Sequence, residues 1–283
     1  MPKNTSKSAI TAWLKSIRIG HLIGLTAAVI ILRHSFYNEF FHLGFVEELF
    51  FILPIVLISA GGNIINDYFD IKEDRSKRPK FAVIGRSLKR RVAILSHVLL
   101  TASGIATAIY LGSKYDTYIP LIIALSASVL LFLYSTVLKG KILLGNFTVA
   151  GIATAYIPFA LVDVKMRNLG DDYDWLCCIV FTAVLIRQIA KDIEDYDIDL
   201  KNNLRTLPVA CSPNKAWSLI YILEIWLIYI SSEVLNRTDT TAIHAIMGVT
   251  ILCTLLFSWR KKTQAVSAWV RLLLFVGLVA IAI

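Results

Sequence analysis

The sequence has little charge and little cysteine. Of its 283 residues, 17% are Asp, Glu, Lys or Arg, against about 25% in ordinary soluble proteins. The four cysteines form no pair with the spacing of a metal site and no disulfide framework, so we expect them to be small apolar residues within helices. With 57% hydrophobic residues and a mean hydropathy of +0.66, the composition excludes an ordinary soluble globular protein and indicates an integral membrane protein.

The apolar residues fall into stretches separated by polar breaks. Each stretch is near the ~20 residues that a helix needs to cross a bilayer. The predicted spans are residues 17–33, 46–66, 91–111, 118–138, 146–163, 174–190, 215–233, 241–259 and 265–283. This pattern predicts an all-α integral membrane fold, with nine transmembrane helices forming one domain over residues 1–283.

The basic residues are distributed unevenly between the two sides of these spans. The polar, basic segment from Met1 to Lys15 has no cleavage-site pattern, and we interpret it as a cytoplasmic lead-in. With the N-terminus in the cytoplasm, 24 of the 29 Lys and Arg residues face the cytoplasm. The five on the other side are Arg33, Lys114, Lys165, Arg167 and Arg237. This asymmetry follows the positive-inside rule, supports nine spans with the C-terminus outside, and accounts for the net charge of +9 without a nucleic-acid partner.

Two acidic segments interrupt the apolar pattern, and both place Asp at offsets 0, 3 and 7. Their members are Asp67, Asp70 and Asp74 in the first segment, and Asp192, Asp195 and Asp199 in the second. On an α-helix these offsets lie within about 60° of one another, so each trio is expected to line one helix face. Both segments follow spans that end in the cytoplasm, so we predict that the two trios meet across one central cavity.

Clustered carboxylates beside a membrane are unfavourable unless a cation neutralises them. Mg²⁺ is the expected cation, and Mg²⁺ held by a few carboxylates usually also holds a phosphate-bearing substrate. A helix end whose acids pair with local Lys and Arg is the simpler alternative, but it leaves the duplicated spacing unexplained.

The residues around the first trio suit a phosphate ligand. Asn63 and Asn66 add oxygen ligands and amide donors on the same helix face. Arg75 and Arg78 begin a basic cluster after the trio, and Arg binds phosphate oxygens in a bidentate way.

Other basic and aromatic residues are weaker candidates for this site. Lys139 could bind a phosphate and Tyr134 could line the cavity, although an interfacial Tyr with a positive-inside Lys explains this pair equally well. Arg187 and Lys191 flank the second trio, so either could reach a pyrophosphate. Arg18 and His21 open the first span, where His21 is expected to pack rather than catalyse.

With these motifs in order, the chain resembles the UbiA family of intramembrane prenyltransferases over essentially its whole length. The resemblance rests on nine spans, N-D-x-x-D-x-x-x-D from Asn66 to Asp74, Tyr134 and Lys139 before Gly145-Asn146, and K-D-x-x-D-x-x-x-D from Lys191 to Asp199, followed by Thr206-Leu207-Pro208. It implies transfer of a prenyl group from a prenyl diphosphate to an acceptor, with release of pyrophosphate.

The resemblance also implies roles for individual residues. Asp67, Asp70, Asp192 and Asp195 look like the main Mg²⁺–diphosphate residues. The supporting residues and the diphosphate contacts would be Asn66, Asp74, Asp199, Lys191, Arg75, Arg78 and Lys139. Mg²⁺ and these cations would stabilise the charge of the departing pyrophosphate, and a membrane-embedded cavity would keep the allyl cation from water. An Asp of the second segment would take the acceptor's proton.

The acceptor is indicated by the loop after the first trio. The R-T-x-x-R-P element typical of members that use aromatic acids or make haem O is absent. Asp74-Arg75-Ser76-Lys77-Arg78-Pro79 looks more like the element of members that prenylate geranylgeranylglyceryl phosphate. Those relatives usually continue with another Arg and Pro, whereas this chain has Phe81 and Ala82. The best prediction is therefore geranylgeranyl transfer to geranylgeranylglyceryl phosphate, and an aromatic acceptor of the 4-hydroxybenzoate, quinone or chlorophyll type is the alternative.

Two other functions fit intramembrane acids less well. A cation-coupled transporter also carries buried acids, but such carriers place them at broken helices near the midplane, whereas these lie at one membrane face. A different Mg²⁺-dependent phosphotransfer enzyme would need a nucleotide motif that the sequence lacks. We expect a multi-pass protein of the cell (inner) membrane with its active site toward the cytoplasm. The sequence gives no prediction of oligomeric state.

Overall fold

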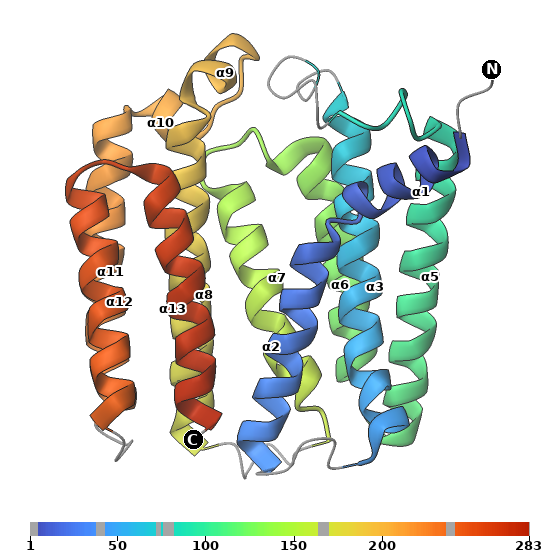
Figure 1. The fold of residues 1–283 in the computed structure, drawn as a ribbon, viewed down its shortest axis with the longest axis horizontal. Helices are drawn as coiled ribbons and strands as arrows, with labels where there is room; N and C mark the ends of the chain where they lie inside the picture. Colours follow the sequence, from blue (N-terminus) through green and yellow to red (C-terminus); the bar gives the residue numbers. More distant parts are fainter. Residues whose placement is uncertain are drawn as a thin grey trace. The chain divides into compact units, whose positions relative to one another are not determined.

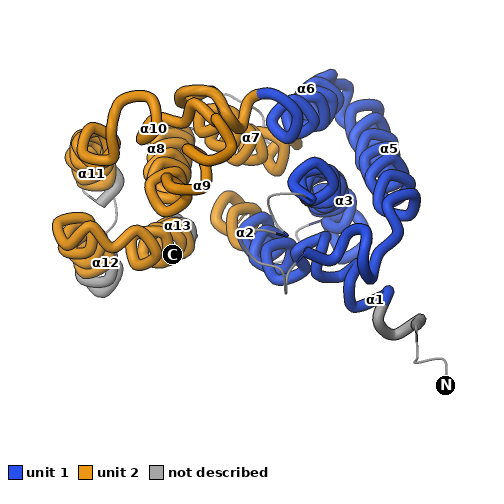
Figure 2. The backbone as a smooth tube through the Cα atoms, turned by 90° about the horizontal axis from the view of Figure 1, so that it is seen from above, with its two compact units in different colours: residues 1–30, 41–137 blue, residues 31–40, 138–283 orange. Residues whose placement is uncertain are grey.

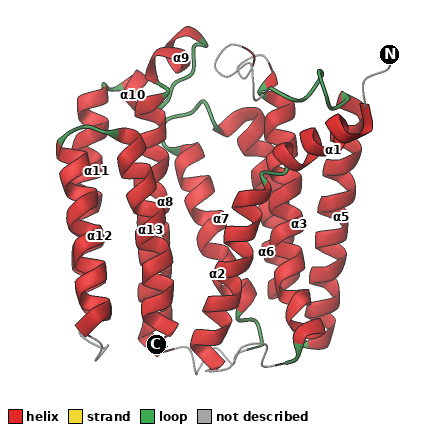
Figure 3. Ribbon diagram, viewed as in Figure 1, coloured by secondary structure: helices red, strands yellow, loops and turns green. Residues whose placement is uncertain are grey.

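Residues 5–37, 43–71, 75, 82–163, 170–235 and 241–282 are described by a computed structural model of the chain. Within these residues the regular structure is helical, apart from one isolated bridge between Ile84 and Leu88, as Figure 3 shows. The helices, labelled in Figure 1, are α1 (Thr5–Ser16), α2 (Ile19–Tyr37), α3 (Phe45–Phe69), α5 (Arg90–Lys114), α6 (Ile119–Leu133), η1 (Tyr134–Leu138), α7 (Leu144–Ala160), α8 (Gly170–Glu194), α9 (Tyr196–Lys201), α10 (Leu207–Ala210), α11 (Pro213–Leu235), α12 (Thr241–Trp259) and α13 (Thr263–Ala282).

Each predicted span coincides with a helix among the described residues. Five segments are long and apolar enough to cross a membrane: α2, α3, α5, α11 and the combined stretch Ile119–Leu138. Shorter apolar helices are Leu144–Ala160, Gly248–Trp259 and Thr263–Gly277. The chain is therefore a multi-pass membrane protein, and the count of nine crossings, the central cavity and the cytoplasmic N-terminus stay predictions.

The segment interpreted as a lead-in is in large part helical, because α1 covers Thr5–Ser16. Its apolar residues are split between two faces: Ala12 is 3% exposed, whereas Ile10 is 62% exposed. Such a helix packs one face on the protein and presents the other to its surroundings.

The chain divides into two compact units, coloured in Figure 2. Unit 1 comprises Met1–Ile30 and Phe41–Val137. Within it, α3 packs against α1, α5 and α6, and Figure 2 shows α3 as the inner helix of this unit. Gly61 and Gly104 let α3 and α5 approach closely, since a Cβ on Gly104 would lie 2.8 Å from the Ile58 side chain. Small residues at a helix contact have this effect in membrane proteins.

Unit 2 comprises Ile31–Phe40 and Leu138–Ile283. Its central helix is α8, which packs against α7, α11 and α13. Ile186, Ile189 and Ala190 of α8 are fully buried in the core of this unit. The core therefore fixes the last turns of α8, directly before the second acidic segment.

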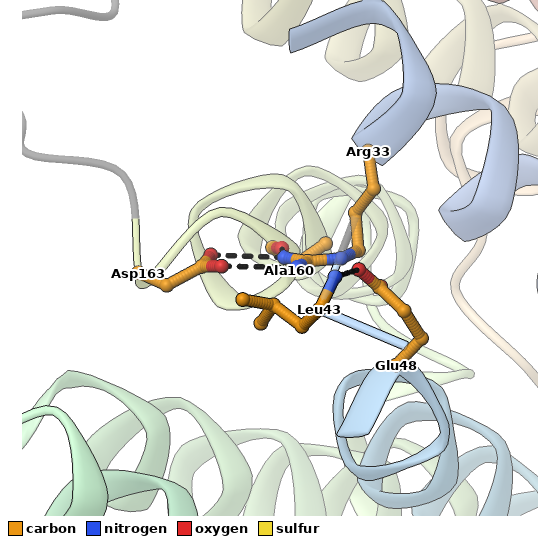
Figure 4. Close-up of polar contacts among 5 residues, drawn as sticks. All are labelled: Arg33, Leu43, Glu48, Ala160 and Asp163. Atoms are coloured by element: carbon orange, nitrogen blue, oxygen red, sulfur yellow. Dashed lines mark hydrogen bonds and ion pairs between the residues drawn. The ribbon is translucent and has the colours of Figure 1, made fainter. Parts of the chain in front are cut away.

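A buried ion pair ties two helix ends together in unit 2 (Figure 4). Arg33 Nη1 and Nη2 each donate to a carboxylate oxygen of Asp163 at 2.9 Å, and Nη1 also donates to the carbonyl of Ala160 at 2.6 Å. The two side chains are 3% and 5% exposed. Arg33 thus joins the last turns of α2 to the end of α7.

Candidate functional site

The first acidic segment begins on the last turn of α3, where Asp67 forms an ion pair with Arg18. The distance from Arg18 Nη2 to Asp67 Oδ1 is 2.9 Å, and the two side chains are 47% and 17% exposed. Arg18 lies between α1 and α2, in the same unit as Asp67. The guanidinium makes a charge-assisted hydrogen bond to this carboxylate, which holds Asp67 in place at the end of α3.

Of the two amides predicted to assist the first trio, Asn66 contacts one of its acids, whereas Asn63 bonds to the Ile17 backbone. Asn66 Nδ2 donates to Asp70 Oδ2 at 2.8 Å, and the Asp70 backbone N–H donates to the Asn66 carbonyl at 2.9 Å. Asn63 Nδ2 donates to the carbonyl of Ile17 at 3.0 Å. Asp70 ends α3 as its C-terminal cap, so its carboxylate is fixed at the helix end.

The chain after the first trio returns to the core of unit 1. Asp74 and Arg78, both predicted site residues, lie outside the described residues. Arg75 is exposed, and a Cβ on Gly85 would lie 3.0 Å from its Nη2 atom. Val83 and Ile84, within the stretch where the sequence departs from the resembling enzymes, are 8% and 2% exposed, so this stretch packs into the protein.

In the second acidic segment, Asp192 is fixed by Asn146 of α7. Asn146 is 6% exposed, and its Nδ2 donates to Asp192 Oδ2 at 2.7 Å. Asp192 lies beyond the predicted span 174–190. Burial raises the pKa of its carboxyl to about 6, although the hydrogen bond from Asn146 by itself lowers that pKa. A nearby cation would favour the ionised form of this carboxylate.

The second trio does not lie on one uninterrupted helix, so that expectation is wrong. Helix α8 ends at Glu194 and α9 begins at Tyr196. The Ile198 N–H donates to the Asp195 carbonyl at 3.0 Å, a three-residue bond that tightens the turn. The chain therefore bends at Asp195 before it reaches the third acid.

Asp199 is the most deeply buried acid of the second trio. Its side chain is 4% exposed, and Thr206 Oγ1 donates to its Oδ2 at 3.1 Å. Its backbone carbonyl accepts a hydrogen bond from the Leu204 N–H at 2.9 Å. Asp199 therefore closes the turn after α9, and its predicted role as a metal ligand stays a prediction.

The remaining predicted diphosphate contacts lie in two places: Tyr134 and Lys139 are at the end of α6, and Lys191 is on α8 beside the second segment. Tyr134 begins the π-helical stretch η1 in unit 1, and such stretches are frequent at functional sites. Lys139 is half-buried directly after η1, and Lys191 is exposed beside Asp192. Their contacts with a substrate stay predictions.

The donor set of each unit suits Mg²⁺. Among the residues that the structure describes, no three His, Cys, Asp or Glu side chains are close enough to hold a metal ion by themselves. Mg²⁺ is usually bound by one or two carboxylates together with substrate phosphates. Asp67 and Asp70 in unit 1, and Asp192 and Asp195 in unit 2, are oxygen donors of this kind.

Arg18 and Asn146 each contact an acid of one segment, and neither had an assigned role from the sequence. Arg18 is a basic residue at the start of a span, which the positive-inside rule alone explains. Asn146 is an amide at the start of an apolar stretch, and an amide that is buried in such a place needs a polar partner. That signal could have identified Asn146 but not the acid that it contacts.

Several proteins with similar sequences share the name digeranylgeranylglyceryl phosphate synthase. The chain is 34% identical over 173 residues to the digeranylgeranylglyceryl phosphate synthase of Thermococcus gammatolerans. The match covers 60% of this chain and 60% of that relative, so the chain spans less than two thirds of the relative's length in the alignment.

Solved structures show the same fold. A structure of digeranylgeranylglyceryl phosphate synthase in membranes matches with a TM-score of 0.75 at 22% identity, over 97% of each chain. A UbiA homolog from Archaeoglobus fulgidus bound to GPP and Mg²⁺ matches with a TM-score of 0.68 at 16% identity, over 96% of this chain and 100% of that one. The sequence pattern of the UbiA prenyltransferase family matches residues 21–279. The chain therefore belongs to the UbiA prenyltransferase family.

Proposed function

We propose that the protein transfers a geranylgeranyl group from geranylgeranyl diphosphate to geranylgeranylglyceryl phosphate in a Mg²⁺-dependent reaction. The C–O bond between the prenyl C1 and the diphosphate breaks, and the acceptor's hydroxyl oxygen bonds to C1. Pyrophosphate leaves with the electron pair of the broken bond, and the acceptor's proton passes to a base. Relatives named digeranylgeranylglyceryl phosphate synthase and the loop from Asp74 to Pro79 support this acceptor.

The main support for this function is that both acidic segments present carboxylates that other side chains hold in place. Arg18 holds Asp67, and Asn146 holds Asp192. Fixed charges stabilise a developing charge without reorganising during the reaction. Mg²⁺ would supply positive charge to the departing pyrophosphate, and Arg75, Lys139 and Lys191 would add to it.

Residues 1–283 would form one prenyltransferase domain in which both acidic segments act on one diphosphate. The active site would face the cytoplasm, and the host membrane would be the cell (inner) membrane. The uneven distribution of basic residues supports this orientation. Both substrates carry long hydrocarbon chains, which explains why such an enzyme works inside a bilayer. An Asp of the second segment would accept the acceptor's proton.

The test is a membrane assay with radiolabelled geranylgeranyl diphosphate and Mg²⁺, with each candidate acceptor offered separately. A labelled diether lipid phosphate is the expected product. A labelled prenyl-hydroxybenzoate would keep the enzyme class and replace the acceptor. Full activity in excess EDTA would contradict the metal dependence.

Two neighbouring acids provide a matched pair of variants. Asp192→Asn should lower turnover by at least about 100-fold, the scale of losing one charge-stabilising group. Asp197 lies in the same segment, is exposed, and falls outside the repeated offsets, so Asp197→Asn should retain most activity. Equal losses in both variants would contradict the assignment of roles by spacing.

A further inference from the structure

Two loops that are far apart in the sequence meet within unit 2. The first follows η1 and contains Lys139, and the second is the turn that follows α9. The Arg205 backbone N–H donates to the Gly140 carbonyl at 2.8 Å. A Cβ on Gly140 would lie 2.8 Å from Leu204 Cδ2, and 3.6 Å and 3.7 Å from Leu204 Cβ and Cγ. We call this contact of Gly140 with Leu204 and Arg205 the Gly140 junction, and its closeness leaves no room for a side chain at position 140.

The turn after α9 is fixed to the second acidic segment. The Leu204 N–H donates to the Asp199 carbonyl at 2.9 Å, and Thr206 Oγ1 donates to Asp199 Oδ2 at 3.1 Å. Asn203 in this turn has a φ of 56°, a left-handed conformation typical of a tight turn. Asp199 also lies near enough for its charge to act on Asp192. One side of the Gly140 junction is therefore part of the second acidic segment.

The loop before α7 is attached to the same segment at a second point. Asn146, in the first turn of α7, donates to Asp192 Oδ2 at 2.7 Å. The short stretch from Gly140 to Asn146 is thus held at both ends by the chain that carries the second trio. Lys139 directly precedes this stretch and is half-buried. Its backbone is therefore placed relative to Asp192 by two contacts, of which the Gly140 junction is the nearer in the sequence.

We propose that the Gly140 junction positions Lys139 to bind the diphosphate together with the second acidic segment. Gly140 is a positioning residue in this arrangement, because it would act through Lys139 without touching the substrate. A lysine is a point charge on a flexible stem, so a fixed backbone limits the space that its ammonium explores and lowers the cost of ordering it on a phosphate oxygen. This inference rests on the proposed function and deepens it, since it assigns part of the diphosphate affinity to a contact between two loops.

A larger side chain at position 140 tests the junction. Gly140→Val adds two methyl groups beyond the Cβ, so it meets Leu204 along its length and not only at its mobile end. The KM for geranylgeranyl diphosphate should rise about tenfold, the effect of losing one charge-assisted hydrogen bond, and the KM for geranylgeranylglyceryl phosphate should stay unchanged. Gly248→Val in α12 is the matched control, because a Cβ there meets nothing within 4 Å, and it should leave both KM values unchanged.

A second substitution makes room for the larger side chain. Leu204→Ala removes the Cγ and Cδ atoms and keeps the backbone hydrogen bond between Arg205 and Gly140. The double variant Gly140→Val/Leu204→Ala should therefore regain most of the affinity for geranylgeranyl diphosphate. A double variant with a KM as high as that of Gly140→Val would show that the close approach of the two loops does not set this affinity, and would overturn the inference.

Removing Lys139 separates positioning from general damage to the site. Binding of geranylgeranyl diphosphate is measured with Mg²⁺ and without acceptor, on protein in lipid nanodiscs. Gly140→Val should weaken binding about tenfold in the wild-type background and hardly at all in Lys139→Ala, because residues that act through one another are not additive. Equal losses in both backgrounds, or wild-type affinity in Gly140→Val, would overturn the inference and leave the proposed function intact. Wild-type protein that binds no geranylgeranyl diphosphate would overturn both.

Discussion

Asn146 is the residue whose removal tests how the second acidic segment is positioned. Its amide donates a hydrogen bond to Asp192 at 2.7 Å, and it is buried. Partners of metal-binding carboxylates typically change metal affinity or activity by about 10–100-fold when they are removed. Asn146→Ala should therefore raise the Mg²⁺ concentration needed for half-maximal pyrophosphate release by a factor in this range.

The control for this experiment is an amide that contacts no acid of either segment. Asn214 accepts a hydrogen bond from Lys261 Nζ at 2.9 Å and is exposed. Asn214→Ala should leave the Mg²⁺ dependence unchanged. If Asn146→Ala does the same while it folds normally, Asn146 does not position Asp192 for a metal.

The buried ion pair between Arg33 and Asp163 gives a prediction of stability. Removing one partner of a buried pair leaves an uncompensated charge and typically costs about 3–5 kcal/mol. Asp163→Ala should lower the free energy of unfolding by about that amount, whereas the double variant Arg33→Met/Asp163→Leu should recover most of it, because no charge remains buried. The measurement is reversible unfolding in bilayer-like micelles, and a double variant as unstable as Asp163→Ala would contradict the argument.

At the level of helices, hydropathy predicted where the long helices lie. Predicted spans such as 46–66 and 241–259 match α3 (Phe45–Phe69) and α12 (Thr241–Trp259), because a continuous apolar run signals such a helix directly. Helix α1 was missed because its few apolar residues are interspersed with Ser and Lys. The break at Asp195 was missed because the offsets of three acids carry no information about a turn that Thr206 and Leu204 stabilise.

The candidate site was predictable in its acids but not in their partners. Repeated spacing singles out Asp67 and Asp192 without a structure. Their contacts with Arg18 and Asn146 join residues 49 and 46 positions apart, and such contacts depend on how helices pack. Local sequence patterns extend over a few turns and contain no information about pairings of that range.

The close packing of α3 and α5 predicts a strong effect at one glycine. A Cβ on Gly61 would lie 2.6 Å from Thr101 Oγ1 and 3.3 Å from the His97 carbonyl. Gly61→Leu should therefore lower the free energy of unfolding by about 1–3 kcal/mol, the usual cost of overpacking. Gly248→Leu gains the same helix propensity but meets no atoms, so it should be neutral or stabilising. Thermal unfolding of both variants compares the two effects, and equal stability would contradict the close contact.

For the whole molecule, the assignment of function depends on which side of the membrane each acidic segment faces. Four predicted spans separate the two segments in the sequence, and an even number returns the chain to the same side. The basic residues predict that both segments face the cytoplasm. Segments on opposite faces could not hold one diphosphate, so topology is a direct test of the proposed chemistry.

Single-cysteine labelling measures this topology in a variant that lacks Cys177, Cys178, Cys211 and Cys253. Ser87→Cys, after the first segment, and Lys201→Cys, after the second, replace exposed residues and should react with a membrane-impermeant maleimide only in inverted vesicles. Ser113→Cys, at the far end of α5 (Arg90–Lys114) from Ser87, is also exposed and should react only in intact cells. Labelling of Ser87→Cys and Lys201→Cys from opposite sides would mean that an odd number of spans separates the two acidic segments. One diphosphate could then not contact both Asp67 and Asp192, and the proposed prenyl transfer would have to rely on a single segment.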